Sequence, residues 1–169
     1  MSRELLILRH AKSSWNSGAD SDFERPLAPR GTRNTEQLAK YMFEQGIQPD
    51  LTLCSAAVRA QETAQLALSQ FPGARIEFRE SLYHAGLATL VNSIREQDND
   101  LERLMLVGHN PGMDQLLDYL CKEELTLTSS GKLMTTAALA RIECRSSWAE
   151  LAPETCNLDS LLRPSDLPR

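Results

Sequence analysis

The stretch from Leu5 to Ser13 constrains the fold more than any other part of the sequence. Four aliphatic residues in succession, 5–8, are followed at once by Arg9 and His10. An apolar run of this length is typical of a parallel strand that is buried on both faces. Ligands of open α/β sheets bind beyond the carboxyl ends of the strands, so Arg9 and His10 stand where a site is expected. The alternative is an ordinary strand followed by a charged loop.

Segments of strand length alternate with segments of helical pattern along the rest of the chain. Strands are predicted at residues 51–55, 76–78, 104–107 and 134–143, and helices at 34–45, 56–71, 87–96 and 113–121. A long polar loop, 15–33, precedes the first helix, and we expect the C-terminal tail to wrap the surface. This alternation favours a single α/β domain over residues 1–169, with helices flanking a mainly parallel sheet.

Composition excludes several classes of function. The net charge of −5 argues against general binding to nucleic acid or to a membrane surface. No apolar run approaches the roughly 20 residues of a membrane span, and the N-terminus is charged too early for a secretory signal. The four cysteines form no C-x-x-C pair, which favours buried reduced thiols in a cytoplasmic protein. They are Cys54, Cys121, Cys144 and Cys156.

Two further strand ends carry the same kinds of residue as the first. Ser55 and Arg59 follow the strand at 51–55, and His109 follows the strand at 104–107. Parallel strands end at one edge of a sheet, so two arginines and two histidines would meet there and repel one another unless an anion lies between them. A phosphate group suits arginine best, and Arg59 also lies in the first turn of a predicted helix. Taken singly, Arg59 could be a solvated helix residue and His109 an ordinary turn residue.

The histidines of this cluster are better suited to nucleophilic catalysis than to metal binding. No carboxylate stands beside His10 or His109, and the neighbouring arginines would repel a cation. A neutral imidazole can attack phosphorus and form a phosphohistidine, while arginines and a second histidine stabilise the charge of the phosphoryl group. We therefore expect neither a metal nor another cofactor.

These residues resemble the motifs of the histidine phosphatase superfamily, which has the phosphoglycerate-mutase-like fold. Its Arg-His-Gly signature appears as Arg9-His10-Ala11, with alanine in place of glycine, and residues 9–16 resemble the longer R-H-G-x-S-x-x-N pattern. The second arginine and second histidine of the family match Arg59 and His109. The short chain and the segment Arg25-Pro26-Leu27 are most similar to the bacterial phosphohistidine phosphatase SixA branch.

The resemblance implies a three-layer fold and a role for each matching residue. His10 would be the phosphorylated nucleophile, and Arg9, Arg59 and His109 would hold the phosphoryl group with help from Asn16. Glu80 is the best match to the general acid that family members acting on phosphate esters carry after the third strand; a solvated carboxylate is the alternative. His84, by contrast, is expected to be a loop residue.

The resemblance and the strand-end residues together predict a metal-independent phosphatase that works through a phosphohistidine intermediate. Its expected substrate is phosphohistidine on a signalling or phosphotransfer protein, such as a histidine phosphotransfer domain. The branch acting on phosphohistidine needs no general acid, because imidazole departs more readily than an alkoxide. A phosphatase for a small phosphate ester is the alternative, with a mutase less favoured. A non-catalytic phosphate-binding module is a third hypothesis, but a pure binder needs no nucleophile.

Overall fold

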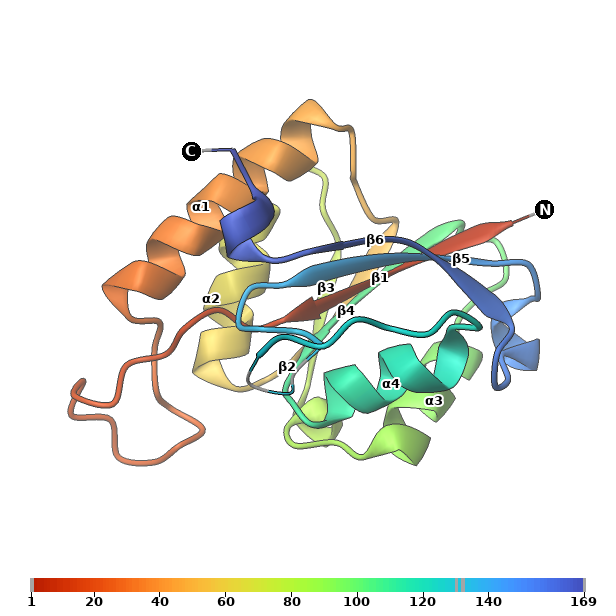
Figure 1. Ribbon diagram of the computed structural model, residues 1–169. Coiled ribbons are helices and arrows are strands. Elements are labelled where there is room, and N and C mark those ends of the chain that lie inside the picture. Colours follow the sequence, from red (N-terminus) through yellow and green to blue (C-terminus); the bar gives the residue numbers. More distant parts are fainter. Residues whose placement is uncertain (1, 130, 132, 169) are drawn as a thin grey trace.

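A six-stranded mixed sheet forms the middle layer of the protein, in the order β3-β2-β4-β1-β5-β6 (Figure 1). The computed structural model describes residues 2–129, 131 and 133–168. Four strands run parallel, and the last two are antiparallel to their neighbours. The strands are β1 (Arg3–Arg9), β2 (Leu51–Ser55), β3 (Ile76–Arg79), β4 (Arg103–Gly108), β5 (Leu139–Cys144) and β6 (Cys156–Leu162).

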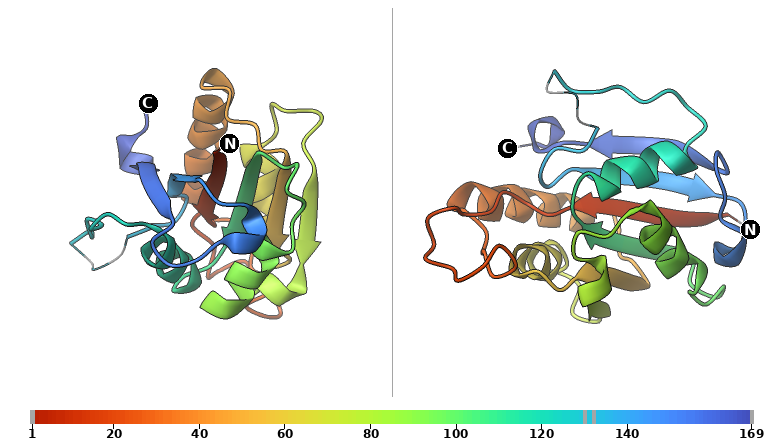
Figure 2. Two further views of the ribbon diagram at one scale, coloured as in Figure 1. Left: turned by 90° about the vertical axis from the view of Figure 1, so that its right-hand side faces the viewer. Right: turned by 90° about the horizontal axis from the view of Figure 1, so that it is seen from below.

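Two pairs of helices cover the two faces of this sheet, as Figures 1 and 2 show. One core lies between the sheet and α1 (Pro29–Glu44) with α2 (Val58–Ala67), and the other lies beneath α3 (Leu87–Arg95) and α4 (Gly112–Leu120). Short 3-10 turns occur at η1 (Glu80–Leu82), η2 (Trp148–Glu150) and η3 (Pro164–Asp166).

The apolar run of β1 is explained by these two cores. Leu6 and Leu8 pack in the core under α1 and α2, whereas Leu5 and Ile7 pack in the opposite core, and none of the four side chains is exposed. Burying an aliphatic side chain of this size stabilises the fold by roughly 1.5–3 kcal/mol. The strand therefore needs apolar residues at every position, as the sequence predicted for a parallel sheet.

The carboxyl ends of the parallel strands lie at one edge of the sheet. Arg9 at the end of β1 is in register with Gly108 at the end of β4, and β4 in turn pairs with β2. The loop 10–28 leaves this edge, on the side away from the N-terminus (Figure 2). The α/β fold and its three layers are thus as predicted.

Three predicted segments differ from the structure. Helix α1 begins at Pro29, so Arg30 and Gly31 belong to its first turn rather than to a loop. The last predicted strand begins only at Leu139, because Ala137 has a left-handed backbone (φ 61°) that interrupts extended structure. The tail does not simply wrap the surface but adds β6 to the sheet.

The prediction of four reduced cysteines is wrong for one pair. Cys144 and Cys156 face each other across β5 and β6, with Cα atoms 4.4 Å apart, and form a disulfide. Cys54 and Cys121 are free and buried. Within the described part of the chain, no helix is both long enough and apolar enough to cross a membrane.

The close approach of α1 to the loop that follows β1 generates a first prediction. A Cβ atom at Gly31 would overlap the carbonyl oxygen of Lys12 and lie 2.9 Å from its nitrogen. Both are backbone atoms, so we expect Gly31→Ala to lower the free energy of unfolding by about 1–3 kcal/mol in urea titrations. Gly73→Ala is the matched control, since a Cβ there meets no atom within 4 Å. Equal stability of the two variants would contradict the packing described.

Candidate active site

The chain contains three histidines, and the structure brings all of them together. His10 follows β1, His109 follows β4, and His84 lies in the turn after η1. The ring centre of His109 is 5.0 Å from that of His10 and 5.3 Å from that of His84. This cluster lies at the carboxyl edge of the parallel strands, where the sequence predicted a site for His10 and His109.

A hydrogen bond of the His10 side chain determines which ring nitrogen is free. Its Nδ1 lies 2.8 Å from the carbonyl oxygen of Ala11, and because a carbonyl can only accept, Nδ1 carries the proton. In the neutral ring Nε2 then holds a free lone pair. Burial, and to a smaller extent the charges of Arg59 and Arg9, lowers the pKa of His10 to about 4. The hydrogen bond to Ala11 acts in the opposite direction and raises the pKa, but it does not outweigh these causes. His10 is therefore neutral near pH 7.

His109 is held by the hydroxyl group of Ser55. Its Nε2 lies 2.7 Å from Ser55 Oγ, and the same oxygen accepts a hydrogen bond from the backbone N–H of Ala57. The Ser55 hydroxyl can donate its own proton to Nε2 while its oxygen accepts from Ala57, and a neutral His109 then carries its proton on Nδ1. Burial and the neighbouring His10 and Arg59 lower the pKa of His109 to about 3.

Arg59, in the first turn of α2, is buried and bound to the loop 10–28. Its Nη1 donates to the carbonyl oxygen of Asp22 at 2.7 Å, and its Nη2 lies 3.0 Å from Asp22 Oδ2. A guanidinium group has five N–H donors in a plane. Asp22 thus orients Arg59 while leaving donors for another oxyanion.

Arg9 is oriented from the opposite side by the segment that leads to β5. Its Nη1 donates to the carbonyl oxygen of Met134 at 3.0 Å, and Asp114 of α4 accepts hydrogen bonds from the backbone of Leu133 and Met134. Burial lowers the pKa of Arg9, opposed by the charge of Asp114. Within the described residues, the buried Arg9 Nε and His109 Nδ1 have no hydrogen-bond partner, which suits them to a ligand with acceptor oxygens.

Asp22 is a member of this site that sequence reasoning missed. Besides Arg59, its carboxylate accepts hydrogen bonds from Tyr83 Oη at 2.5 Å and Arg25 Nη1 at 2.7 Å. These bonds, that from Tyr83 above all, hold the pKa of Asp22 well below its usual range. The only hint in the sequence is a carboxylate three residues before Arg25 in an unusually long loop.

The remaining candidates are not bound to this cluster. Asn16 and Glu80 are exposed, and in the described part of the chain no hydrogen bond or ion pair joins either side chain to Arg9, His10, Arg59 or His109. His84 lies in a turn, as expected, and its ring is also part of the cluster, 5.3 Å from that of His109.

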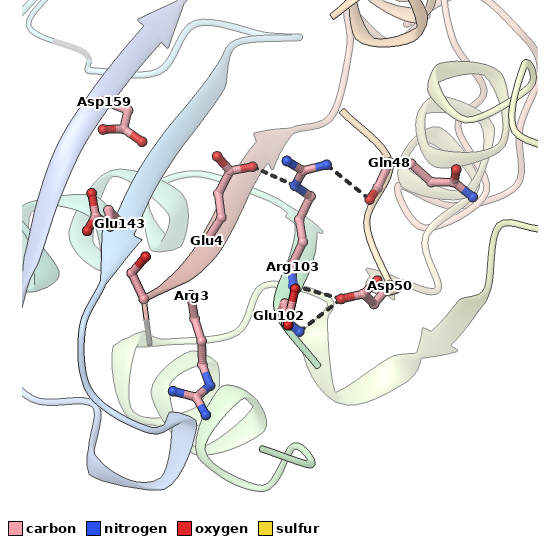
Figure 3. Close-up of a pocket in the computed structure, with 9 residues that line it drawn as sticks. Arg3, Glu4, Gln48, Asp50, Glu102, Arg103, Glu143 and Asp159 are labelled. Carbon is pink, nitrogen blue, oxygen red and sulfur yellow. Dashed lines mark hydrogen bonds and ion pairs between the residues drawn. The ribbon is translucent and has the colours of Figure 1, made fainter. Parts of the chain in front are cut away.

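A hollow of about 390 Å³ at the opposite edge of the sheet offers no comparable chemistry (Figure 3). Carboxylates outnumber the arginines that line it, and Glu4 is already paired, with Arg103 at 2.7 Å and with Arg141 at 2.9 Å. Asp50 accepts backbone hydrogen bonds from Glu102 and Arg103. The described residues also contain no group of three or more His, Cys, Asp or Glu side chains placed to hold a metal ion.

Comparison with known proteins agrees with this geometry. The model of the histidine phosphatase superfamily (branch 1) matches residues 5–86. A candidate phosphohistidine phosphatase SixA from Agrobacterium tumefaciens is 30% identical, with a TM-score of 0.82 over 96% of this chain and 98% of that one. The corresponding protein from Nakamurella multipartitia is 22% identical, with a TM-score of 0.83 over 97% of both chains.

Among curated sequences, an uncharacterised chloroplastic protein of Arabidopsis thaliana is 29% identical over 97% of this chain and 79% of its own length. An uncharacterised protein of Mycobacterium tuberculosis is also 29% identical, over 86% of this chain and 92% of its own. With the matched model and the similarity to the Agrobacterium structure, this chain belongs to the histidine phosphatase superfamily.

Proposed function

We propose that this protein is a metal-independent phosphatase that forms a phosphohistidine on His10. The observation that carries the proposal is the hydrogen bond from His10 Nδ1 to the carbonyl oxygen of Ala11. It leaves Nε2 as the free nitrogen of a neutral ring, in a cluster with Arg59 and His109. A site that only bound phosphate would have no need of a nucleophile prepared in this way.

The reaction proceeds in two steps. His10 Nε2 attacks the phosphorus atom as the leaving group departs, and water then cleaves the N–P bond to release inorganic phosphate. Arg9, Arg59 and His109 donate hydrogen bonds to the phosphoryl oxygens and stabilise the charge that they carry in both transition states. A neutral His10 is essential here, since a protonated His10 has no lone pair with which to attack.

The substrate we propose is phosphohistidine on a signalling or phosphotransfer protein. The similar structures designated SixA support this class. The exposure of His84 also supports it, because 57% of this side chain is in solvent and a bulky substrate can approach it. Beside Asp22, a shallow hollow bordered by the exposed Trp15 adds surface for such a partner.

A substrate comparison tests the function. We expect the wild type to release phosphate from a phosphorylated histidine phosphotransfer domain faster than from a panel of sugar phosphates, with and without a chelator. Acid-labile phosphate should be trapped on the wild type and not on His10→Ala, whose folding is checked by circular dichroism. Full trapping on His10→Ala, or activity that requires a divalent ion after chelation, would contradict the proposal.

The residues that hold the phosphoryl group give a second prediction. Arg59→Ala and His109→Ala should each lose roughly 2.7–4 kcal/mol of transition-state stabilisation, by analogy with the loss of one oxyanion donor. This corresponds to about a hundredfold or more in kcat/KM. Arg75→Ala, at an exposed arginine before β3, is the control. Near-wild-type rates for either site variant would remove that residue from the mechanism.

The buried neutral state of His10 predicts a dependence of stability on pH. An unfolded histidine titrates near pH 6.5, whereas the pKa of folded His10 is about 4. Between these values the unfolded chain binds a proton that the folded protein does not. The free energy of unfolding therefore falls as the pH falls, by up to about 1.4 kcal/mol per pH unit for this residue. Urea titrations from pH 7 to pH 5 should show a smaller loss in His10→Gln, and equal slopes would show that His10 is not kept neutral.

A further inference from the structure

We propose that His84 is the proton-transfer residue of this site and that Asp22 positions it. The inference rests on the proposed function and extends it, because it assigns the acid and base of both steps to a histidine that the family motifs do not include. Glu80, the match suggested by sequence, lies on the same segment and is the rival candidate.

His84 lies where a group that exchanges protons with the leaving group and with water is expected. His10 is 8% exposed and attacks from within, so the leaving group and the water must lie on the side of the opening. His84 stands there, 57% exposed, with its ring 5.3 Å from that of His109. A packing role alone would not leave more than half of the side chain in solvent.

The groups that face His84 come from three segments. Asp22 Oδ2, from the loop 10–28, lies 3.4 Å from His84 Nε2. Tyr83, the preceding residue, has its ring 4.1 Å from that of His84, and His109 approaches from the turn after β4. Arg59 adds a positive charge nearby, because its Nη2 forms an ion pair with the same Oδ2 atom of Asp22. Because Asp22 faces Nε2, the other ring nitrogen, Nδ1, is left to exchange protons with the substrate.

His84 is held in this position with an unfavourable backbone conformation. Its φ of 53° lies in the left-handed region, which residues other than glycine adopt uncommonly. The next residue, Ala85, packs so closely on the start of α4 that a Cβ atom at Gly112 would lie 2.7 Å from its carbonyl oxygen. Such left-handed residues persist where the surrounding structure enforces them, and they are frequent at active sites.

The proton balance of the two steps is complete with His84 alone. In the first step the bond from phosphorus to the leaving atom breaks while the bond to His10 Nε2 forms, and protonated His84 gives its Nδ1 proton to the leaving atom. In the second step neutral His84 takes a proton from water as the oxygen bonds to phosphorus and the N–P bond breaks. His84 ends protonated, and His10 regains its lone pair.

Glu80 lacks these contacts. Its carboxylate is exposed and, in the part of the chain that the structure describes, forms no ion pair or hydrogen bond with Asp22, His109 or any other member of the cluster. The two candidates are four residues apart, so matched variants distinguish them.

The test compares two aryl esters whose leaving groups differ in their need for a proton. Phenyl phosphate releases a basic phenolate, whereas p-nitrophenyl phosphate releases a stable anion. In His84→Asn, which keeps a residue that tolerates left-handed backbone, kcat/KM for phenyl phosphate should fall about a hundredfold more than for p-nitrophenyl phosphate. The phosphorylated His10 formed by this variant should also decay more slowly than that of the wild type. Added imidazole should restore phenyl phosphate cleavage to His84→Gly, because the site is open to solvent.

Each other outcome is decisive. Equal losses on both esters, or a leaving-group effect in Glu80→Gln with none in His84→Asn, would overturn the role of His84 while the phosphatase function stands. A wild-type protein that transfers no phosphoryl group to His10 from phosphoramidate or from either ester would overturn the proposed function and this inference together.

Discussion

The parallel pairing of β1 with β4 is the constraint on which the rest of the site depends. Arg9 lies opposite Gly108, and the ladder continues with a hydrogen bond of 3.0 Å from the His10 N–H to the carbonyl oxygen of Gly108. His10 and His109 therefore leave the sheet side by side. Two histidines almost a hundred positions apart in the chain meet because two buried apolar strands share a register, and the register is set by cores on both faces of the sheet.

The same arrangement gathers basic groups where they would otherwise repel one another. Two unit charges 4 Å apart interact by about 4 kcal/mol at an effective dielectric constant of 20. The protein limits this repulsion by keeping His10 and His109 neutral through burial and by giving Arg59 a counter-ion in Asp22. A phosphoryl group would add the negative charge that the cluster lacks. Burial is the main cause of the lowered histidine pKa values, and the Arg59 charge that adds to it also makes the site receptive to a phosphate anion.

Sequence reasoning succeeded where the determinants are local. The apolar runs of β1, β2 and β4 and the polar residues after them are visible in the sequence, so the strand ends and the meeting of His10 with His109 could be predicted. Asp22 and His84 could not, because their approach depends on the path of the loop 10–28 and on a left-handed backbone at His84. Strand β6 was missed for a different reason: its residues are mostly half-buried and do not alternate clearly. The disulfide between β5 and β6 follows from that missed pairing.

Ala11 stands where the family signature has glycine, and the structure shows why alanine is tolerated at this position. A glycine would be required if residue 11 had a left-handed backbone, but among the described residues positive φ occurs outside glycine only at His84, Ala137 and Glu154. The methyl group of Ala11 is fully buried, and its N–H donates to Thr63 Oγ1 at 3.0 Å. The carbonyl oxygen of the same residue fixes the tautomer of His10. Ala11 therefore costs the site no backbone strain, and its two backbone groups tie His10 to α2, the helix that carries Arg59.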